Sequence, residues 1–435
     1  MIEDTDSRHI EAINRIETLS GRSLGAGLIG NVLEWYDFGL YGFLAPLIGA
    51  HFFPSSHRIV SLLGAYAGFA IGFAMRPIGG VIFGHIGDRL GRRTMLALSI
   101  VMMASATTLI GLLPTYQQIG VLAPVLLVAV RLFQGLSVGG ELTGSVSYLI
   151  ETAPRRHRGL AGSFANIGSE GGYILASALA AATFILLRHY GAAAWIWRLP
   201  FLAGALLGLI AWILLRRASR AGYEPDPQAA PARELPLTQA LRESPRSMLL
   251  TVAFTWGYGA LNYLTLVFLP AFAGRFGAIP PGTALTISTV LQIAALGLIP
   301  LAGWLTDRFI RRRHLMLLVF AAVSLSAIAL FKLSEHGNVA LFWVTQGSFI
   351  VLLFLIEGTA PAMLAELFST RYRASGYSVA FNIGLGFGGG TAPLIATALI
   401  APLGRLAGAQ YLVACSVLSL VAVYMMSDRS REPLL

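Results

Sequence analysis

The chain has 435 residues, of which 56% are hydrophobic and 12% are charged, and its formal net charge is +10. Soluble domains contain about 25% charged residues, so this composition excludes an ordinary soluble protein. The positive charge does not indicate a nucleic-acid partner, because Lys and Arg concentrate in short segments between long apolar stretches. If the N-terminus is internal, most of these segments fall on the cytoplasmic side, which is the charge distribution of a membrane protein.

The apolar stretches predict an all-α integral membrane protein. A helix needs about 20 residues to cross a bilayer, and twelve stretches reach that length. They lie near residues 24–48, 61–83, 94–113, 121–150, 160–187, 195–215, 247–273, 283–305, 314–333, 339–365, 376–401 and 406–426. We therefore expect twelve transmembrane helices in the cytoplasmic (inner) membrane, with both termini in the cytoplasm.

Two short charged blocks occur twice along the chain. The turn Gly84–Arg93 follows the second span, and a related turn, Gly303–Arg312, follows the eighth. The block Glu151–Arg158 follows the fourth span, and Glu366–Arg373 follows the tenth. The same order in both halves predicts two pseudo-symmetric six-helix bundles, and such duplication in a membrane protein usually indicates transport.

A proline-rich segment separates the two predicted bundles. Residues 216–246 contain five prolines, a density typical of a linker. The predicted organisation is a cytoplasmic N-terminal segment 1–23, a bundle 24–215, a cytoplasmic linker 216–246, a bundle 247–426 and a short cytoplasmic tail 427–435.

The charged turn Gly84–Arg93 resembles the signature of the major facilitator superfamily, and Arg131-Leu-Phe-Gln-Gly resembles another of its motifs. The chain is also similar to the metabolite:proton symporter family at Gly30–Phe38, Arg76–Gly80, Arg131–Glu141 and Trp197–Phe201. This resemblance implies the major facilitator fold and a transporter that functions as a monomer. Members of that family carry proline and betaine, α-ketoglutarate, citrate or shikimate with a proton. We expect no cofactor, and the proton is the coupling ion.

Four ionisable residues inside predicted spans are candidates for proton coupling. Each costs at least roughly 2.5–3.5 kcal/mol at mid-span, so each needs a partner or a function. Glu34, Asp37 and Tyr41 share one helical face, and two carboxylates that close to each other favour proton uptake. Arg131 stays charged and must meet an acid or an anionic solute; the resemblance implies a coupling role. Glu141 is either the proton site or the partner of Arg131, and the alternative for all four is a structural ion pair.

Polar and aromatic side chains inside the spans are candidates for solute binding. Arg76 suits a carboxylate, whereas the acids and the aromatic residues of the seventh span suit an amine or a quaternary ammonium group. Contacts between helices, snorkelling to the surface or membrane-interface positions are the alternatives. The candidates are Tyr41, Arg76, Asn166, Glu170, Tyr173, Trp256, Tyr258, Asn262, Tyr263, Gln292, Gln346, Glu357 and Asn382.

The repeated turns predict a cytoplasmic gate. An aspartate at a helix end can accept hydrogen bonds from a helix N-terminus or pair with arginine, and the resemblance implies that such contacts latch the two bundles. The candidate gate residues are Gly84, Asp88, Arg89, Arg92, Asp307 and Arg308. The alternative is that the turns only mark topology.

The sequence therefore predicts a secondary active transporter that takes up a small carboxylate-bearing or zwitterionic metabolite together with a proton. A proton-coupled efflux antiporter of the same fold is the alternative, and a non-transporting receptor is a further one. An enzyme is not expected, because the sequence shows no nucleophile motif, metal cluster or phosphate loop. The expected partners are the lipid bilayer, a small organic metabolite and a proton, with no metal and no nucleic acid.

Overall fold

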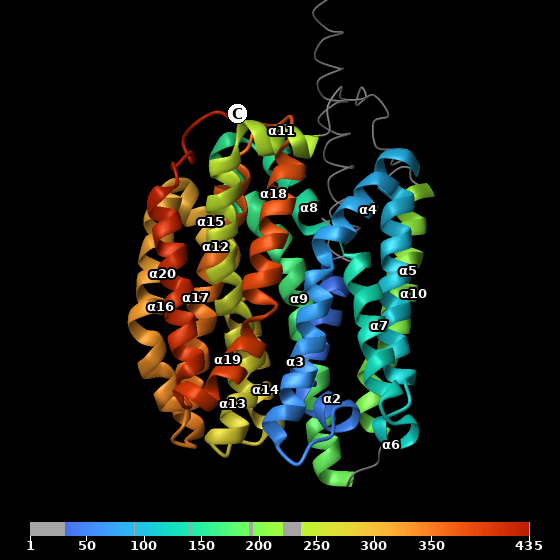
Figure 1. The fold of residues 1–435 in the computed structure, drawn as a ribbon. Helices are drawn as coiled ribbons and strands as arrows, with labels where there is room; N and C mark the ends of the chain where they lie inside the picture. The colour runs from blue at the N-terminus through green and yellow to red at the C-terminus, as the bar shows by residue number, and fades with distance from the viewer. Residues whose placement is uncertain (1–30, 91, 139–140, 191–194, 221–235, 435) are drawn as a thin grey trace, which may run out of the picture.

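A computed structural model describes residues 31–90, 92–138, 141–190, 195–220 and 236–434. Within these ranges the chain is helical and contains no strand (Figure 1). Residues 31–43 are helical and are followed by α2 (Ala45–Phe52), α3 (Arg58–Ala74), α4 (Arg76–Leu90), α5 (Arg92–Leu112), α6 (Tyr116–Ile119), α7 (Leu122–Ser137), α8 (Glu141–Thr152), η1 (Arg155–His157), α9 (Arg158–Tyr190), η2 (Ile196–Arg198) and α10 (Leu199–Arg220).

The second half begins with α11 (Pro236–Glu243). It continues with α12 (Pro245–Tyr263), η3 (Leu264–Phe268), α13 (Leu269–Phe276), α14 (Pro281–Ala295), α15 (Leu298–Arg308), α16 (Arg312–Ser334), α17 (Val339–Ala365), α18 (Arg373–Ile383), η4 (Gly384–Gly389), α19 (Ala392–Leu403) and α20 (Ala407–Met425).

The predicted membrane architecture is confirmed. Among the described residues, ten helical stretches are long and apolar enough to cross a membrane, and each coincides with a predicted span. Of the two other predicted spans, 24–48 is described and helical from residue 31, and 94–113 contains a shorter apolar helix, Ala97–Leu112. The total of twelve remains a prediction.

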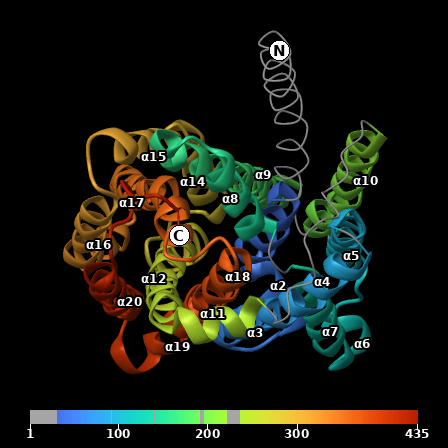
Figure 2. The same cartoon turned by 90° about the horizontal axis from the view of Figure 1, so that it is seen from above.

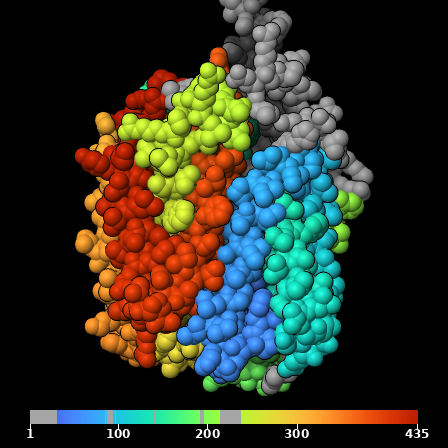
Figure 3. Space-filling view, in the orientation of Figure 1, coloured from blue at the N-terminus to red at the C-terminus, as the bar shows by residue number. Residues whose placement is uncertain are grey.

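The helices run side by side between two ends of the molecule. The C-terminus and α11 lie at one end (Figure 1), which we call the α11 end. Seen from that end, the helices of the first half gather on one side and those of the second half on the other (Figure 2). The space-filling view shows the two groups in contact along their length (Figure 3). Helix α9 packs against α14, α15 and α17, so it joins the two halves.

Two of the long helical stretches contain a π-helical turn. The turn η3 lies between α12 and Pro270, and the turn η4 lies between α18 and Pro393. Proline lacks the N–H that a regular helix would use, and π turns are frequent at functional sites. The turn η3 comes directly after Tyr263, whose side chain is fully buried.

Candidate functional site

Four charged side chains are buried within the first half. Glu34, Asp37, Arg76 and Arg131 are 1%, 2%, 3% and 0% exposed. Charges this deeply buried need compensating partners, and the structure gives each acid a different one.

Glu34 forms an ion pair with Arg76, at the start of α4. The Arg76 guanidinium carbon also lies 5.3 Å from the ring centroid of Trp35 and 5.1 Å from the centroid of Phe73. These rings attract the cation through their faces. Of the alternatives that the sequence left open for Glu34 and Arg76, the structure shows the ion pair.

Asp37 is linked to Arg131 by a chain of hydrogen bonds. The Arg131 Nη1 group donates to the Gln134 side chain. Gln134 Nε2 donates to Thr107 Oγ1 over 3.3 Å, and Thr107 donates to Asp37 Oδ1. Within the described structure, Asp37 Oδ2 and Arg131 Nη2 have no hydrogen-bond partner. Asp37 and Arg131 are therefore coupled through these hydrogen bonds and not through a direct ion pair.

Thr107 can exchange its hydrogen-bond acceptor. Its hydroxyl also lies 2.9 Å from the Met103 carbonyl oxygen, and a hydroxyl has a single proton to donate. When Asp37 is ionised, Thr107 can donate to it; when Asp37 is protonated, Thr107 can turn to Met103. Sequence reasoning did not select Thr107 or Gln134, although Gln134 belongs to the motif around Arg131.

Tyr41 completes this cluster. The Arg131 guanidinium carbon lies 4.2 Å from the Tyr41 ring centroid, which is a cation–π distance. The α3 backbone approaches closely, because Arg131 Nε donates to the Gly68 carbonyl oxygen over 3.4 Å. A Cβ at Gly72 would lie 3.0 Å from Arg131 Nη2, so a small residue there leaves room for the guanidinium.

A second pair of acids lies where the two halves meet. The carboxyl groups of Glu170 on α9 and Glu357 on α17 lie within hydrogen-bonding reach of each other. Tyr258 and Asn262 of α12 each donate to Glu357 Oε1 over 3.4 Å. Asn166 donates to the Glu357 backbone oxygen over 2.8 Å, which ties α9 to α17 at the same level.

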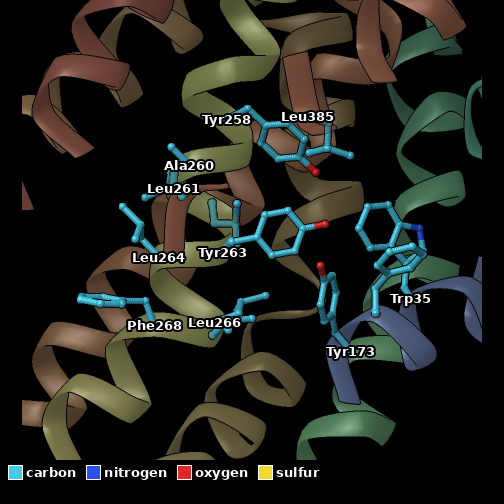
Figure 4. Packing of buried hydrophobic residues seen from close by; sticks show 14 of the residues in the cluster. Trp35, Tyr173, Tyr258, Ala260, Leu261, Tyr263, Leu264, Leu266, Phe268 and Leu385 are labelled. Atoms are coloured by element: carbon cyan, nitrogen blue, oxygen red, sulfur yellow. The ribbon is translucent and has the colours of Figure 1, made fainter. Parts of the chain in front are cut away.

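Aromatic side chains from both halves surround this position. Figure 4 shows the hydroxyl groups of Tyr173 and Tyr263 pointing toward each other, with Trp35 and Tyr258 beside them. The Tyr173 ring centroid lies 5.3 Å from that of Trp35 and 6.5 Å from that of Tyr263. The structure thus brings predicted residues from three distant segments into one central cluster.

The remaining solute-binding candidates lie elsewhere. Gln292 donates to Ser288 within its own helix, and Gln346 reaches the same Ser288 hydroxyl over 3.0 Å. Asn382 donates to Ser378 within α18. The Trp256 ring packs on Gly388 of η4, and its indole N–H lies beside Tyr411 and Cys415, not beside Tyr258.

Asp307 bridges the halves at the α11 end. Its two carboxylate oxygens accept hydrogen bonds from the Gly159 and Leu160 N–H groups over 2.8 and 2.9 Å. These N–H groups belong to the first turn of α9, where unpaired donors and the helix dipole favour an anion. The backbones touch here, because a Cβ at Gly159 would lie 2.6 Å from the Gly303 oxygen.

Ion pairs extend this contact between the halves. Arg373 pairs with Glu151 over 2.7 Å, and Arg158 pairs with Glu366 over 3.8 Å. Arg312 contacts both Asp307 and Glu366. Sequence reasoning selected Asp307 but missed the other gate residues, which are Glu151, Arg158, Arg312, Glu366 and Arg373. The signal was present, since Glu151–Arg158 and Glu366–Arg373 form the second repeated block, and each acid pairs with the arginine of the other copy.

Five candidates cannot be placed in a contact. The structure describes the helical backbone, but not the side-chain surroundings, at Gly84, Asp88, Arg89, Arg92 and Glu141. Arg308 is exposed and lies 5.6 Å from the Trp304 ring, so it does not join the contacts around Asp307.

The interface between the halves is closed along α9. Beyond the contacts at Asp307, the Ser177 hydroxyl lies 2.6 Å from that of Thr289 on α14. Each of Glu34, Glu170 and Glu357 is at most 2% exposed. The acids at the centre therefore have almost no contact with solvent in this conformation.

Comparison with known proteins identifies the family. Residues 27–278 match the Major Facilitator Superfamily model. The chain belongs to the major facilitator superfamily.

Relatives of this major facilitator protein confirm the resemblance seen in its sequence. A protein of Staphylococcus aureus (strain COL) is 34% identical over 95% of this chain and 90% of its own length. The "Glycine betaine/proline/ectoine/pipecolic acid transporter OusA" of Dickeya dadantii (strain 3937) is 31% identical, and the "Proline/betaine transporter" of Escherichia coli (strain K12) is 30% identical. Both matches cover 95% of this chain and 84% of the relative.

A solved structure confirms the fold. The crystal structure of a D-xylose-proton symporter superposes with a TM-score of 0.72 and covers 95% of this chain and 99% of its own, at 18% identity. The family model and the curated relatives, and not this fold likeness, show that the chain is a multi-pass membrane transporter and not an enzyme.

Proposed function

We propose that this transporter takes up a small zwitterionic metabolite together with a proton. The observation that carries the proposal is the buried chain from Asp37 through Thr107 and Gln134 to Arg131. Asp37 is an acid that can bind a proton, and its Oδ2 oxygen has no hydrogen-bond partner in the described structure. Arg131 stays positively charged, and the strength with which the chain holds it depends on whether Asp37 is ionised.

The distribution of charge supports a zwitterionic solute. Arg76 and Arg131 in the first half can attract a carboxylate group. On the other side, Glu170 and Glu357 lie among Tyr173, Tyr258 and Tyr263, and aromatic faces with nearby acids suit an ammonium group. The names of the Dickeya and Escherichia relatives include proline and betaine, which carry one charge of each sign.

The coupling would follow from the protonation of Asp37. Ionised Asp37 orders Thr107 and Gln134 and holds Arg131 through them. A proton on Asp37 removes the negative charge, so Arg131 becomes available to the solute carboxylate. Once the transporter has bound the proton and the solute, its two halves rock about the central cluster and expose that cluster to the cytoplasmic side of the membrane.

The α11 end would form the gate that faces the cytoplasm. Arg155, Arg156 and Arg311 are exposed there, and basic segments remain on the cytoplasmic side of membranes. We accordingly place both termini inside and the protein in the inner membrane of a bacterium, where it works as a monomer of two six-helix bundles.

Uptake by the Asp37→Asn variant tests this proposal. Purified protein in lipid vesicles is given labelled glycine betaine or proline and an inward proton gradient. We expect the wild type to accumulate the solute and the variant to lose gradient-driven accumulation while it still exchanges labelled for unlabelled solute. Asp428→Asn, at the α11 end and away from the central cluster, is the control and should accumulate normally. Full accumulation by Asp37→Asn would refute the assignment of the proton.

A further inference from the structure

The contact between Glu170 and Glu357 requires its own explanation. Both side chains are buried, and their carboxyl groups lie within hydrogen-bonding reach of each other. In the described part of the chain neither forms an ion pair, whereas Glu34 and Glu366 both pair with arginine. Two ionised carboxylates in contact inside a protein repel each other strongly.

The surrounding groups do not cancel that repulsion. The facing groups are Tyr258, Asn262 and Tyr263 from α12, and Tyr173 from α9. Tyr263 also lies near the Glu34–Arg76 ion pair, which has no net charge. Tyrosine and asparagine are uncharged at neutral pH. Within the described structure, one oxygen of each acid, Glu170 Oε2 and Glu357 Oε2, accepts no hydrogen bond from an N–H or O–H group.

We propose that Glu170 and Glu357 form a second proton site, in which one proton is held between two carboxyl groups that come from opposite halves of the transporter. One proton on two acids replaces the repulsion by a strong hydrogen bond. The pair keeps one negative charge, which Tyr258 and Asn262 stabilise by donating to Glu357 Oε1. This site is separate from Asp37, which lies with Thr107 and Arg131.

The shared proton would stabilise the closed interface. When the halves separate, water reaches both acids, the O–H bond breaks, and the proton passes to solvent and leaves two solvated carboxylates. The Asn166 bond to the Glu357 backbone crosses the same interface but does not titrate. Acid pH should therefore favour the closed conformation, and the effect should fade as rising pH removes the shared proton.

Infrared spectroscopy of the full chain in lipid tests for this proton. Asp37→Asn serves as the background, so that Asp37 does not contribute a protonated acid. We expect the carbonyl band of a protonated carboxylic acid at neutral pH in this background, and its loss when either Glu170→Gln or Glu357→Gln is added. Glutamine can still donate a hydrogen bond to the remaining carboxylate, so both variants should fold. Adding Glu335→Gln, at the end of α16, should leave the band unchanged.

Absence of the band from the Asp37→Asn protein would overturn the proposal, as would its persistence at equal intensity in both double variants. Thermal unfolding gives a second readout. The midpoint of the Asp37→Asn protein should fall by several degrees as the pH rises, and adding Glu357→Gln should remove most of that slope. An equal slope in both proteins would contradict the shared proton. Neither result depends on whether Asp37 couples uptake, because that assignment is decided by uptake alone.

Discussion

The variant Asp307→Ala should open the α11 end of the transporter. In the closed conformation Asp307 accepts two backbone hydrogen bonds from α9, on the other half of the molecule. Hydrogen bonds to a charged group contribute about 1.5–3 kcal/mol each. Taking the lower value, their loss removes about 3 kcal/mol from the closed state, because the bonds cannot persist once the halves separate. Since about 1.4 kcal/mol corresponds to a tenfold change, the ratio of closed to open molecules should fall about 100-fold.

Distances between spin labels measure this ratio directly. Arg156 and Arg311 are exposed on opposite sides of the contact, and cysteines there can be labelled after the buried Cys415 is replaced by alanine. Double electron–electron resonance should show a single short distance in the parent and an added longer distance with Asp307→Ala. Arg308→Ala, the exposed neighbour, is the matched control and should match the parent. An unchanged distance distribution with Asp307→Ala would refute the role of these bonds in closure.

Two further predictions concern the same end. Gly159→Ala introduces a Cβ 2.6 Å from the Gly303 oxygen. Overpacking costs about 1–3 kcal/mol, so the same distance measurement should show opening. Gly144→Ala is the control, because no atom lies within 4 Å of its Cβ, and it should show no opening. Glu151→Ala removes the acid that pairs with Arg373 but keeps the hydrogen bonds of Arg373 to the Ala365 and Phe368 carbonyl oxygens, and it should slow uptake severalfold. Uptake at the parent rate would mean that the ion pair does not matter for transport.

The helices could be predicted from the sequence because hydropathy alone determines where a chain can cross a bilayer. The pairing of Glu34 with Arg76 was also foreseeable, since buried charges need partners. The contacts between the repeated blocks were not, because the sequence does not specify how two bundles dock. Only the structure shows that Glu151 faces Arg373 rather than the arginine of its own block.

The candidates of the seventh span show where helical spacing would have sharpened the prediction. Tyr258 and Asn262 are four residues apart and share a face, and both reach Glu357. Trp256 is two residues from Tyr258, and residues at that spacing do not face each other. The same reasoning separates Asp307 from Arg308, since adjacent residues of a helix point in different directions. Thr107 could not be selected, because a threonine inside an apolar span usually bonds its own helix, and the Met103 carbonyl oxygen lies within reach as that alternative acceptor.

The movement of protons with the solute tests the central claim most directly. Vesicles with no imposed gradient enclose a pH-sensitive dye, and glycine betaine or proline is added outside to protein inserted with its α11 end inward. The proposed symport predicts that the interior acidifies while labelled solute enters, and that Asp37→Asn abolishes the acidification. Solute entry accompanied by alkalinisation would show an antiporter, and entry without any pH change would contradict proton coupling altogether.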